Sequence, residues 1–95
     1  MATLTGSAPT AHASRYLQQL CKHWSHKFAV EFDTDRGRIE LPFGETRLTA
    51  GPDAVAIDVA LAQGADAEKA KAVIADHLNR FAFREGALEF EWREA

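Results

Sequence analysis

The chain has 95 residues, of which 46% are hydrophobic and 26% charged, a balance typical of a globular domain and not of a disordered segment. A chain of this length forms one domain with a single modest core. Its formal net charge of −3 lacks the basic excess that binding to a phosphate backbone requires, so we expect no nucleic acid partner.

The compartment follows from the cysteine content and the first residues. Cys21 is the single cysteine, so the chain forms no intramolecular disulfide and suits a reducing cytoplasm. The start of the sequence has no signal-peptide pattern, and no apolar run is long enough to span a membrane. We expect a cytoplasmic protein with a small, polar, flexible tail at residues 1–10 and one domain at residues 11–95.

A helix is predicted from residue 11 or 14 to residue 26, because apolar residues recur there at spacings of three and four. Thr10 and Ser14 are both candidates for its N-cap. The apolar stripe consists of Tyr16, Leu17, Leu20, Cys21 and Trp24. We therefore expect Cys21 to be a small buried side chain with an unreactive thiol.

Four runs of alternating apolar residues follow, and each predicts a strand with one buried face. They cover residues 28–32, 38–43, 46–50 and 54–61. Their short connections contain glycine, aspartate and proline, as tight turns do. The four strands are therefore expected to form a meander.

Asp66 predicts the start of a second helix at residues 67–82, and a last alternating strand is expected at residues 87–92. One apolar face per strand and one stripe per helix predict an α+β two-layer sandwich of the order α-β-β-β-β-α-β. Both helices should cover one face of a five-stranded, mostly antiparallel sheet. Since antiparallel pairs outnumber parallel ones, the last strand should pair with strand 28–32, which leaves strand 54–61 at an edge. The alternative is a parallel pair between the last strand and strand 54–61.

Three segments carry a resemblance to a known family: "SRYLQQLCKHWSHK", "GRIELPFGETRL" and "DHLNRFAFRE". From about residue 11 to residue 92 the chain resembles the small bacterial proteins grouped as domain of unknown function 2218. The resemblance implies a TBP-like α+β sandwich, similar to the C-terminal domain of phosphohexomutases. It also implies an association with iron uptake, because such domains occur fused or adjacent to siderophore-interacting flavin reductases. Such a reductase, or another protein, is the expected partner.

The first helix contains residue types that bind metals. On a helix Cys21 lies roughly 160° from His23 and about 140° from His26, so one ion cannot bind all three side chains. His23 and His26 do share a side, but histidines in a last helical turn are also favoured by the free carbonyls and the helix dipole. We predict no metal site and no cofactor, and we take His23, His26 and Lys27 as candidate ligand-binding residues.

His77 is a separate candidate, because it lies on the apolar stripe of the second helix and needs a hydrogen-bond partner there. If the helices run antiparallel, Asp66 and Glu68 should lie near the end of the first helix. His77 should then lie near Tyr16. It is expected to bond to Tyr16 or to a backbone carbonyl, and the alternative is a ligand contact with charge supplied by Arg80 or Arg84.

The outward face of the sheet mixes acidic residues with arginines and is expected to repel phosphates. A small uncharged strip on strand 54–61 consists of Ala54, Ala56 and Ala60. At a sheet edge such a strip supports pairing with a second chain, so the protein is expected to be a monomer or a weak homodimer.

Two functions fit these patterns. The first is a non-enzymatic binding or accessory module in iron-siderophore handling. The alternative is a small metal-dependent or acid-base enzyme that uses His23 and His26. The sequence has no phosphate-binding loop and no nucleophile elbow, and the resemblance supplies no catalytic residue, so the first is favoured.

Overall fold

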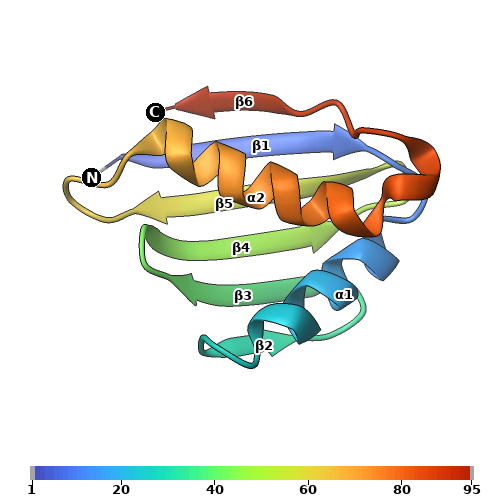
Figure 1. The fold of residues 1–95 in the computed structure, drawn as a ribbon, viewed down its shortest axis with the longest axis horizontal. Coiled ribbons are helices and arrows are strands. Elements are labelled where there is room, and N and C mark those ends of the chain that lie inside the picture. The colour runs from blue at the N-terminus through green and yellow to red at the C-terminus, as the bar shows by residue number, and fades with distance from the viewer. Residues whose placement is uncertain (1, 95) are drawn as a thin grey trace.

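The computed structural model describes residues 2–94, in which six antiparallel strands form one sheet of the order β2-β3-β4-β5-β1-β6 (Figure 1). Met1 and Ala95 lie outside the described residues. The strands are β1 (Thr3–Pro9), β2 (Val30–Phe32), β3 (Arg36–Leu41), β4 (Gly44–Ala50), β5 (Ala54–Leu61) and β6 (Glu91–Glu94). The helices are α1 (Ala13–Trp24), α2 (Ala67–Phe81) and the short 3-10 helix η1 (Phe83–Glu85).

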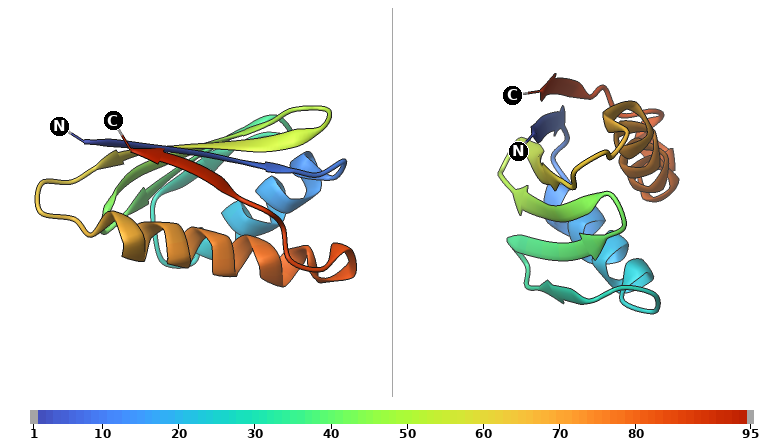
Figure 2. Two further views of the ribbon diagram at one scale, coloured as in Figure 1. Left: turned by 90° about the horizontal axis from the view of Figure 1, so that it is seen from above. Right: turned by 90° about the vertical axis from the view of Figure 1, so that its left-hand side faces the viewer.

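Both α-helices lie on the same face of the sheet, which leaves the opposite face uncovered (Figure 2). Helix α1 packs against strands β2 to β5, and α2 extends over the β5-β1-β6 half of the sheet (Figures 1 and 2). This arrangement confirms the predicted α+β two-layer sandwich. Neither of these helices is long and apolar enough to cross a membrane, and the same holds for every helix within residues 2–94.

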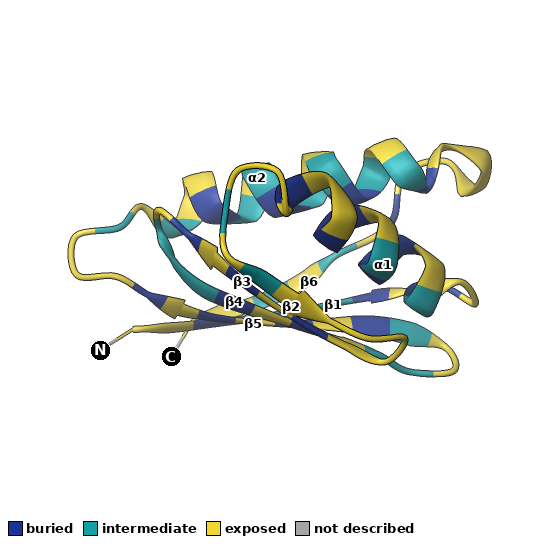
Figure 3. Cartoon of the chain, turned by 90° about the horizontal axis from the view of Figure 1, so that it is seen from below, coloured by how far each residue is buried: buried dark blue, intermediate teal, exposed yellow. Residues whose placement is uncertain are grey.

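The core lies between the two layers, where the buried positions of strands and helices face one another (Figure 3). Strand β5 has the predicted bounds, and its buried residues are the predicted Val55, Ile57, Val59 and Leu61. The predicted stripe of α1 is also buried. In α2 the fully buried positions are Ala70, Ile74 and Leu78. Period two in strands and spacings of three and four in helices thus identify most of the core.

The prediction of a flexible tail at residues 1–10 is wrong, because residues 3–9 form strand β1 inside the sheet. Antiparallel ladders join β1 to β5 on one side and to β6 on the other. Its inward residues Leu4 and Ala8 are fully buried. The inward positions of β1 hold Leu, Gly and Ala, and the last two are small, so the apolar alternation is weak. The sequence pattern of this strand therefore resembles that of a polar tail.

Gly6 occupies the inward position of β1 between Leu4 and Ala8, because the indole ring of Trp92 lies directly over it. A Cβ atom at Gly6 would lie 2.4 Å from Cε3 of Trp92, far inside contact distance. Trp92 stands opposite Gly6 in the ladder between β1 and β6. Its ring is stacked on that of Phe90, with centroids 5.6 Å apart. The small residue in β1 and the large one in β6 therefore fill one layer of the core.

The predicted strand order is also wrong, and the missed strand is the reason. Strand β6 lies on the β5 side of the sheet, with β1 between them. This arrangement replaces the unfavoured parallel pair with two antiparallel pairs. The sheet edges are therefore β2 and β6. The alanines of β5 face outward in the interior of the sheet, so they offer no edge for pairing with a second chain.

Candidate functional site

The end of α1 lies against the second half of α2, and four aromatic side chains meet there. The ring centroids of His23 and His77 are 5.6 Å apart, and the ring of Trp24 lies 4.9 Å from that of His77. The ring of Phe81 lies 6.2 Å from that of His23. We call His23, Trp24, His77 and Phe81 the His23–His77 cluster.

This contact corrects the expected packing of the helices. The prediction that His77 lies near Tyr16 is wrong, and so is the prediction that Asp66 and Glu68 lie near the end of α1. Figure 1 shows the start of α2 at the far end of the sheet from α1. The sequence indicates which face of each helix is buried, but it does not fix how far one helix is shifted along the other.

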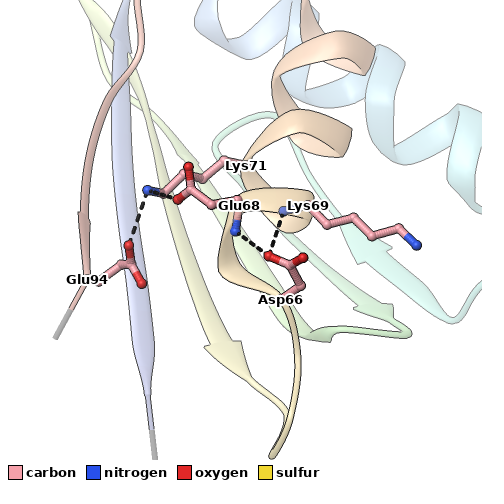
Figure 4. Close-up of polar contacts among 5 residues, drawn as sticks. All are labelled: Asp66, Glu68, Lys69, Lys71 and Glu94. Carbon is pink, nitrogen blue, oxygen red and sulfur yellow. Dashed lines mark hydrogen bonds and ion pairs between the residues drawn. The ribbon is translucent and has the colours of Figure 1, made fainter.

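Asp66 and Glu68 have structural partners of their own (Figure 4). Asp66 is the predicted N-cap of α2, and its Oδ1 accepts hydrogen bonds from the backbone N–H groups of Glu68 and Lys69, at 2.9 and 3.2 Å. Nζ of Lys71 lies 2.6 Å from Oε2 of Glu68 and 3.2 Å from Oε2 of Glu94. Asp66 thus caps the start of α2, while Lys71, paired with Glu68, connects the helix to Glu94 of β6.

His77 bonds to a backbone carbonyl, which was one of the two hydrogen-bond partners expected for it. Its Nδ1 lies 2.7 Å from the carbonyl oxygen of Val73, one helical turn earlier. A carbonyl oxygen only accepts hydrogen bonds, so Nδ1 carries the proton and donates it. The half-buried ring is therefore satisfied, and its Nε2 has a free lone pair.

The remaining candidates lie on the surface around this cluster. His26 and Lys27 follow the end of α1, Arg80 lies near the end of α2, and all three side chains are exposed. Within residues 2–94 no three His, Cys, Asp or Glu side chains are placed to share a metal ion. The structure thus brings His23 to His77, and their ligand-binding role stays a prediction.

Cys21 is fully buried, as predicted. Burial raises the pKa of its thiol to about 11, so the thiol stays protonated near neutral pH. Gly37 of β3 makes room for this side chain, since a Cβ atom there would lie 2.6 Å from Sγ of Cys21. Cys21 is a packing residue.

A polar network that the sequence did not reveal connects η1 to the start of α1. The hydroxyl of Tyr16 donates to Oε2 of Glu85, and the hydroxyl of Thr10 donates to the same oxygen at 2.9 Å. The backbone N–H of His12 in turn donates to Oγ1 of Thr10. Tyr16 was predicted as an apolar stripe residue and as a possible hydrogen-bond partner of His77, and nothing in the spacing of Glu85 indicates that it bonds to Tyr16.

A hollow lies on the uncovered face of the sheet. It has a volume of about 590 Å³ and is lined from strands β2 to β5 by both acidic and basic side chains, chiefly Glu31, Arg36, Arg38, Arg47 and Asp58. Phe32 of the edge strand β2, 37% exposed, borders it, but its side chain alternates to the helix-covered face, because Phe32 stands opposite Gly37, whose Cβ position faces Cys21. A second hollow of about 320 Å³ shares Asp58 and continues across β1 to β6. We call the first of these the sheet-face hollow.

The charges of the sheet-face hollow form a row across the strands. Glu31 stands opposite Arg38, Arg38 opposite Arg47, and Arg47 opposite Asp58. Arg38 forms an ion pair with Glu31, whereas Arg47 forms one with Glu45. Two arginines directly opposite each other repel, so this row is less favourable to folding than an alternating one.

Arg36 adds a third guanidinium to the hollow. It forms no ion pair with any residue of the described chain. Arg36 lies outside the strand predicted at residues 38–43, but β3 begins at Arg36, so its side chain belongs to the sheet. The pattern Arg-Gly-Arg with both arginines outward could have revealed it, since residues two apart in a strand share a face.

Two groups at this hollow, the carboxylate of Asp33 and the guanidinium of Arg38, are held in their charged forms. Hydrogen bonds from the backbone N–H groups of Asp35 and Arg36 lower the pKa of Asp33. The hydrogen bond to Glu31 and its charge raise the pKa of Arg38. Such groups present fixed charges near neutral pH and are poorly suited to exchange protons with a substrate.

These features define a small α+β sandwich with two helices on one face and a charged, uncovered sheet on the other. The family model of an uncharacterized protein conserved in bacteria, DUF2218, matches residues 5–93. The chain belongs to this bacterial family, for which no function is established.

A solved structure supports the same assignment. The NMR structure of PA4090 from Pseudomonas aeruginosa is similar to this chain with a TM-score of 0.73 and 37% sequence identity. The match covers 98% of this chain and 96% of that one. No curated protein matches the chain.

Proposed function

We propose that the chain is a non-enzymatic binding module of iron-siderophore handling that docks a partner protein through its sheet-face hollow. The partner we propose is a siderophore-interacting flavin reductase, the protein class with which the family resemblance associates such domains. Both would act in the cytoplasm. The observation that carries the proposal is a hollow of about 590 Å³ lined by three arginines.

The composition of the hollow supports a protein as the occupant. Arginine is enriched in protein interfaces and among the residues that dominate binding energy. Arg36, Arg38 and Arg47 line the hollow, and Arg36 forms no ion pair with another described residue. Glu31 and Asp58 supply acidic positions, which argue against a phosphate-rich ligand and for a partner with charges of both signs.

The chemistry of the hollow also supports binding over catalysis. Its displaced pKa values, those of Asp33 and Arg38, move away from neutrality. General acid-base catalysis works best with a group whose pKa lies near the working pH. We therefore infer no turnover by this chain alone.

An enzyme that uses His23 and His26 is the alternative. The structure places the ring of His23 against those of His77 and Phe81. The alternative predicts turnover that His26→Ala abolishes, whereas the binding module predicts none to abolish.

Amide chemical shifts of the labelled protein test the proposal. We would titrate the chain with the reductase encoded in the same genome and, separately, with ferric catecholate and ferric hydroxamate siderophores. If the partner docks through the hollow, addition of the reductase should change the amide chemical shifts of β2 to β5 around Glu31, Arg38 and Arg47. The amide chemical shifts of α2 should stay the same. Changes confined to the helices, or none at saturating reductase, would contradict it.

A further inference from the structure

The rings of His23 and His77 meet between α1 and α2, with their centroids 5.6 Å apart. We propose that His23 and His77 bind one divalent transition-metal ion of the zinc, nickel or copper class, with water in the remaining coordination positions. This site is separate from the sheet-face hollow, which lies on the opposite face of the sheet. The proposal therefore does not depend on the proposed function.

The separation of the two rings fits a shared ion. The nitrogen of a zinc-bound imidazole lies about 2.0 to 2.1 Å from the metal, so two rings bound at a tetrahedral angle have centroids about 5 Å apart. The centroids of His23 and His77 are 5.6 Å apart. A small rotation of the exposed His23 side chain closes the difference, whereas Cys21 lies on the buried face of α1 and cannot join them.

The hydrogen bond of His77 prepares the ring for metal binding. Metal-bound histidines almost always donate their second ring N–H to a carboxylate or a backbone carbonyl, which fixes the tautomer. His77 has this arrangement, because its Nδ1 lies 2.7 Å from the carbonyl oxygen of Val73. The lone pair is left on Nε2. The ring also packs on Trp24, which restricts its motion and reduces the entropy lost on binding.

Two imidazoles favour metals of a particular class. Imidazole nitrogen suits zinc, copper and nickel, while carboxylate and water oxygens suit magnesium and calcium. The described residues offer no third histidine, cysteine or carboxylate for the same ion. With two protein ligands and an exposed His23, the site should bind more weakly than a closed structural zinc site. The sequence-based expectation of no metal site did not combine His23 with His77, because His77 was expected near Tyr16.

Calorimetric titration of the metal-stripped full chain with Zn²⁺ and Ni²⁺ tests the proposal. We expect one ion per chain, with binding weakened at least about tenfold by His23→Ala and by His77→Ala. His26→Ala and His12→Ala are matched controls and should bind like the wild type. Since His77→Ala could disturb the fold, its amide spectrum is recorded first, and the exposed His23→Ala provides the independent test.

Three results would overturn the site. The first is no binding tighter than about 1 mM, an affinity worth only about −4 kcal/mol. The second is unchanged affinity in His23→Ala. The third is an equal loss in His26→Ala, which would place the ion within residues 21–27 and not between the two helices.

Discussion

The hydroxyl of Tyr16 donates a hydrogen bond to the carboxylate of Glu85, which lies 69 positions further along the chain. Tyr16 is buried in α1, and Glu85 ends the short helix η1. Thr10, just after β1, bonds to the same carboxylate. The pair therefore joins the two ends of the domain at one side of the sheet.

This pair predicts a defined dependence of stability on pH. The hydrogen bond lowers the pKa of Glu85 below its ordinary 4.5, so its contribution is present above pH 4.5 and is lost as the pH falls through the folded-state pKa. The same bond raises the pKa of Tyr16 above 10.0, so its contribution is present below pH 10 and is lost as the pH rises through that raised value. The pair therefore stabilises the fold between about pH 4.5 and 10.

Tyr16→Phe tests this dependence, because it removes the hydroxyl and keeps the ring. We expect the free energy of unfolding of the variant to fall below that of the wild type at pH 7. The difference should shrink as the pH falls below 4.5. Urea unfolding at several pH values measures it, and a difference that stays constant from pH 3 to pH 7 would show that the bond to Glu85 is not its cause.

Strand β1 predicts that residues near the start of the chain matter for stability. Leu4→Ala should lower the free energy of unfolding by about 2 to 5 kcal/mol, because Leu4 is fully buried. Gly6→Ala should cost about 1 to 3 kcal/mol, because the new methyl group meets the ring of Trp92. Ser7→Ala, on the outward face of the same strand, is the control and should change stability by less than about 0.5 kcal/mol. Equal and small effects of all three substitutions would contradict strand β1 and indicate that residues 3–9 form a flexible tail.

Burial predicts that Cys21 resists modification. Its thiol is inaccessible and has a raised pKa, so a thiol reagent at pH 7.5 should label the folded protein far more slowly than the urea-unfolded protein. The absorbance of the coloured group that a chromogenic reagent releases measures the labelling rates of the folded and the unfolded protein. Rapid labelling without denaturant would show that Cys21 is exposed.

His77 predicts a contrast between two histidines. His77→Ala should lower the free energy of unfolding by about 1 to 3 kcal/mol, since the ring packs on Trp24 and is half-buried. His26→Ala should change it by less than about 0.5 kcal/mol, because His26 is exposed. Urea unfolding compares them. Equal stability of the two variants would mean that the contact between His77 and Trp24 contributes nothing to the fold.

Much of the fold was predictable from local patterns. Strand β5 and the capped start of α2 were predicted because each has a strong signal, an uninterrupted alternation and an N-cap aspartate. Strand β1 was missed because small residues occupy its inward positions. The strand order then failed as a consequence, since it depended on how many strands lie beside β5.

The candidate site was less predictable, because it depends on long-range geometry. His23 and His77 were both identified from their residue type, but their contact depends on how far α1 is shifted along α2. The sheet-face hollow joins residues from four strands, and its Arg38–Arg47 pair follows only from the register of β3 and β4. Register is fixed by turns and core packing, which a list of outward residues does not contain.

The affinity of the reductase for charge-altered variants tests the docking proposal most directly. Arg36→Ser and Arg47→Ser remove guanidinium groups from the sheet-face hollow, and Arg84→Ser removes an exposed one from the far end of the helical layer. Calorimetry at fixed salt should show that the first two variants bind the reductase at least about tenfold more weakly than the wild type, with Arg84→Ser unchanged. Equal affinity of all four proteins, or a loss confined to Arg84→Ser, would contradict docking through the hollow.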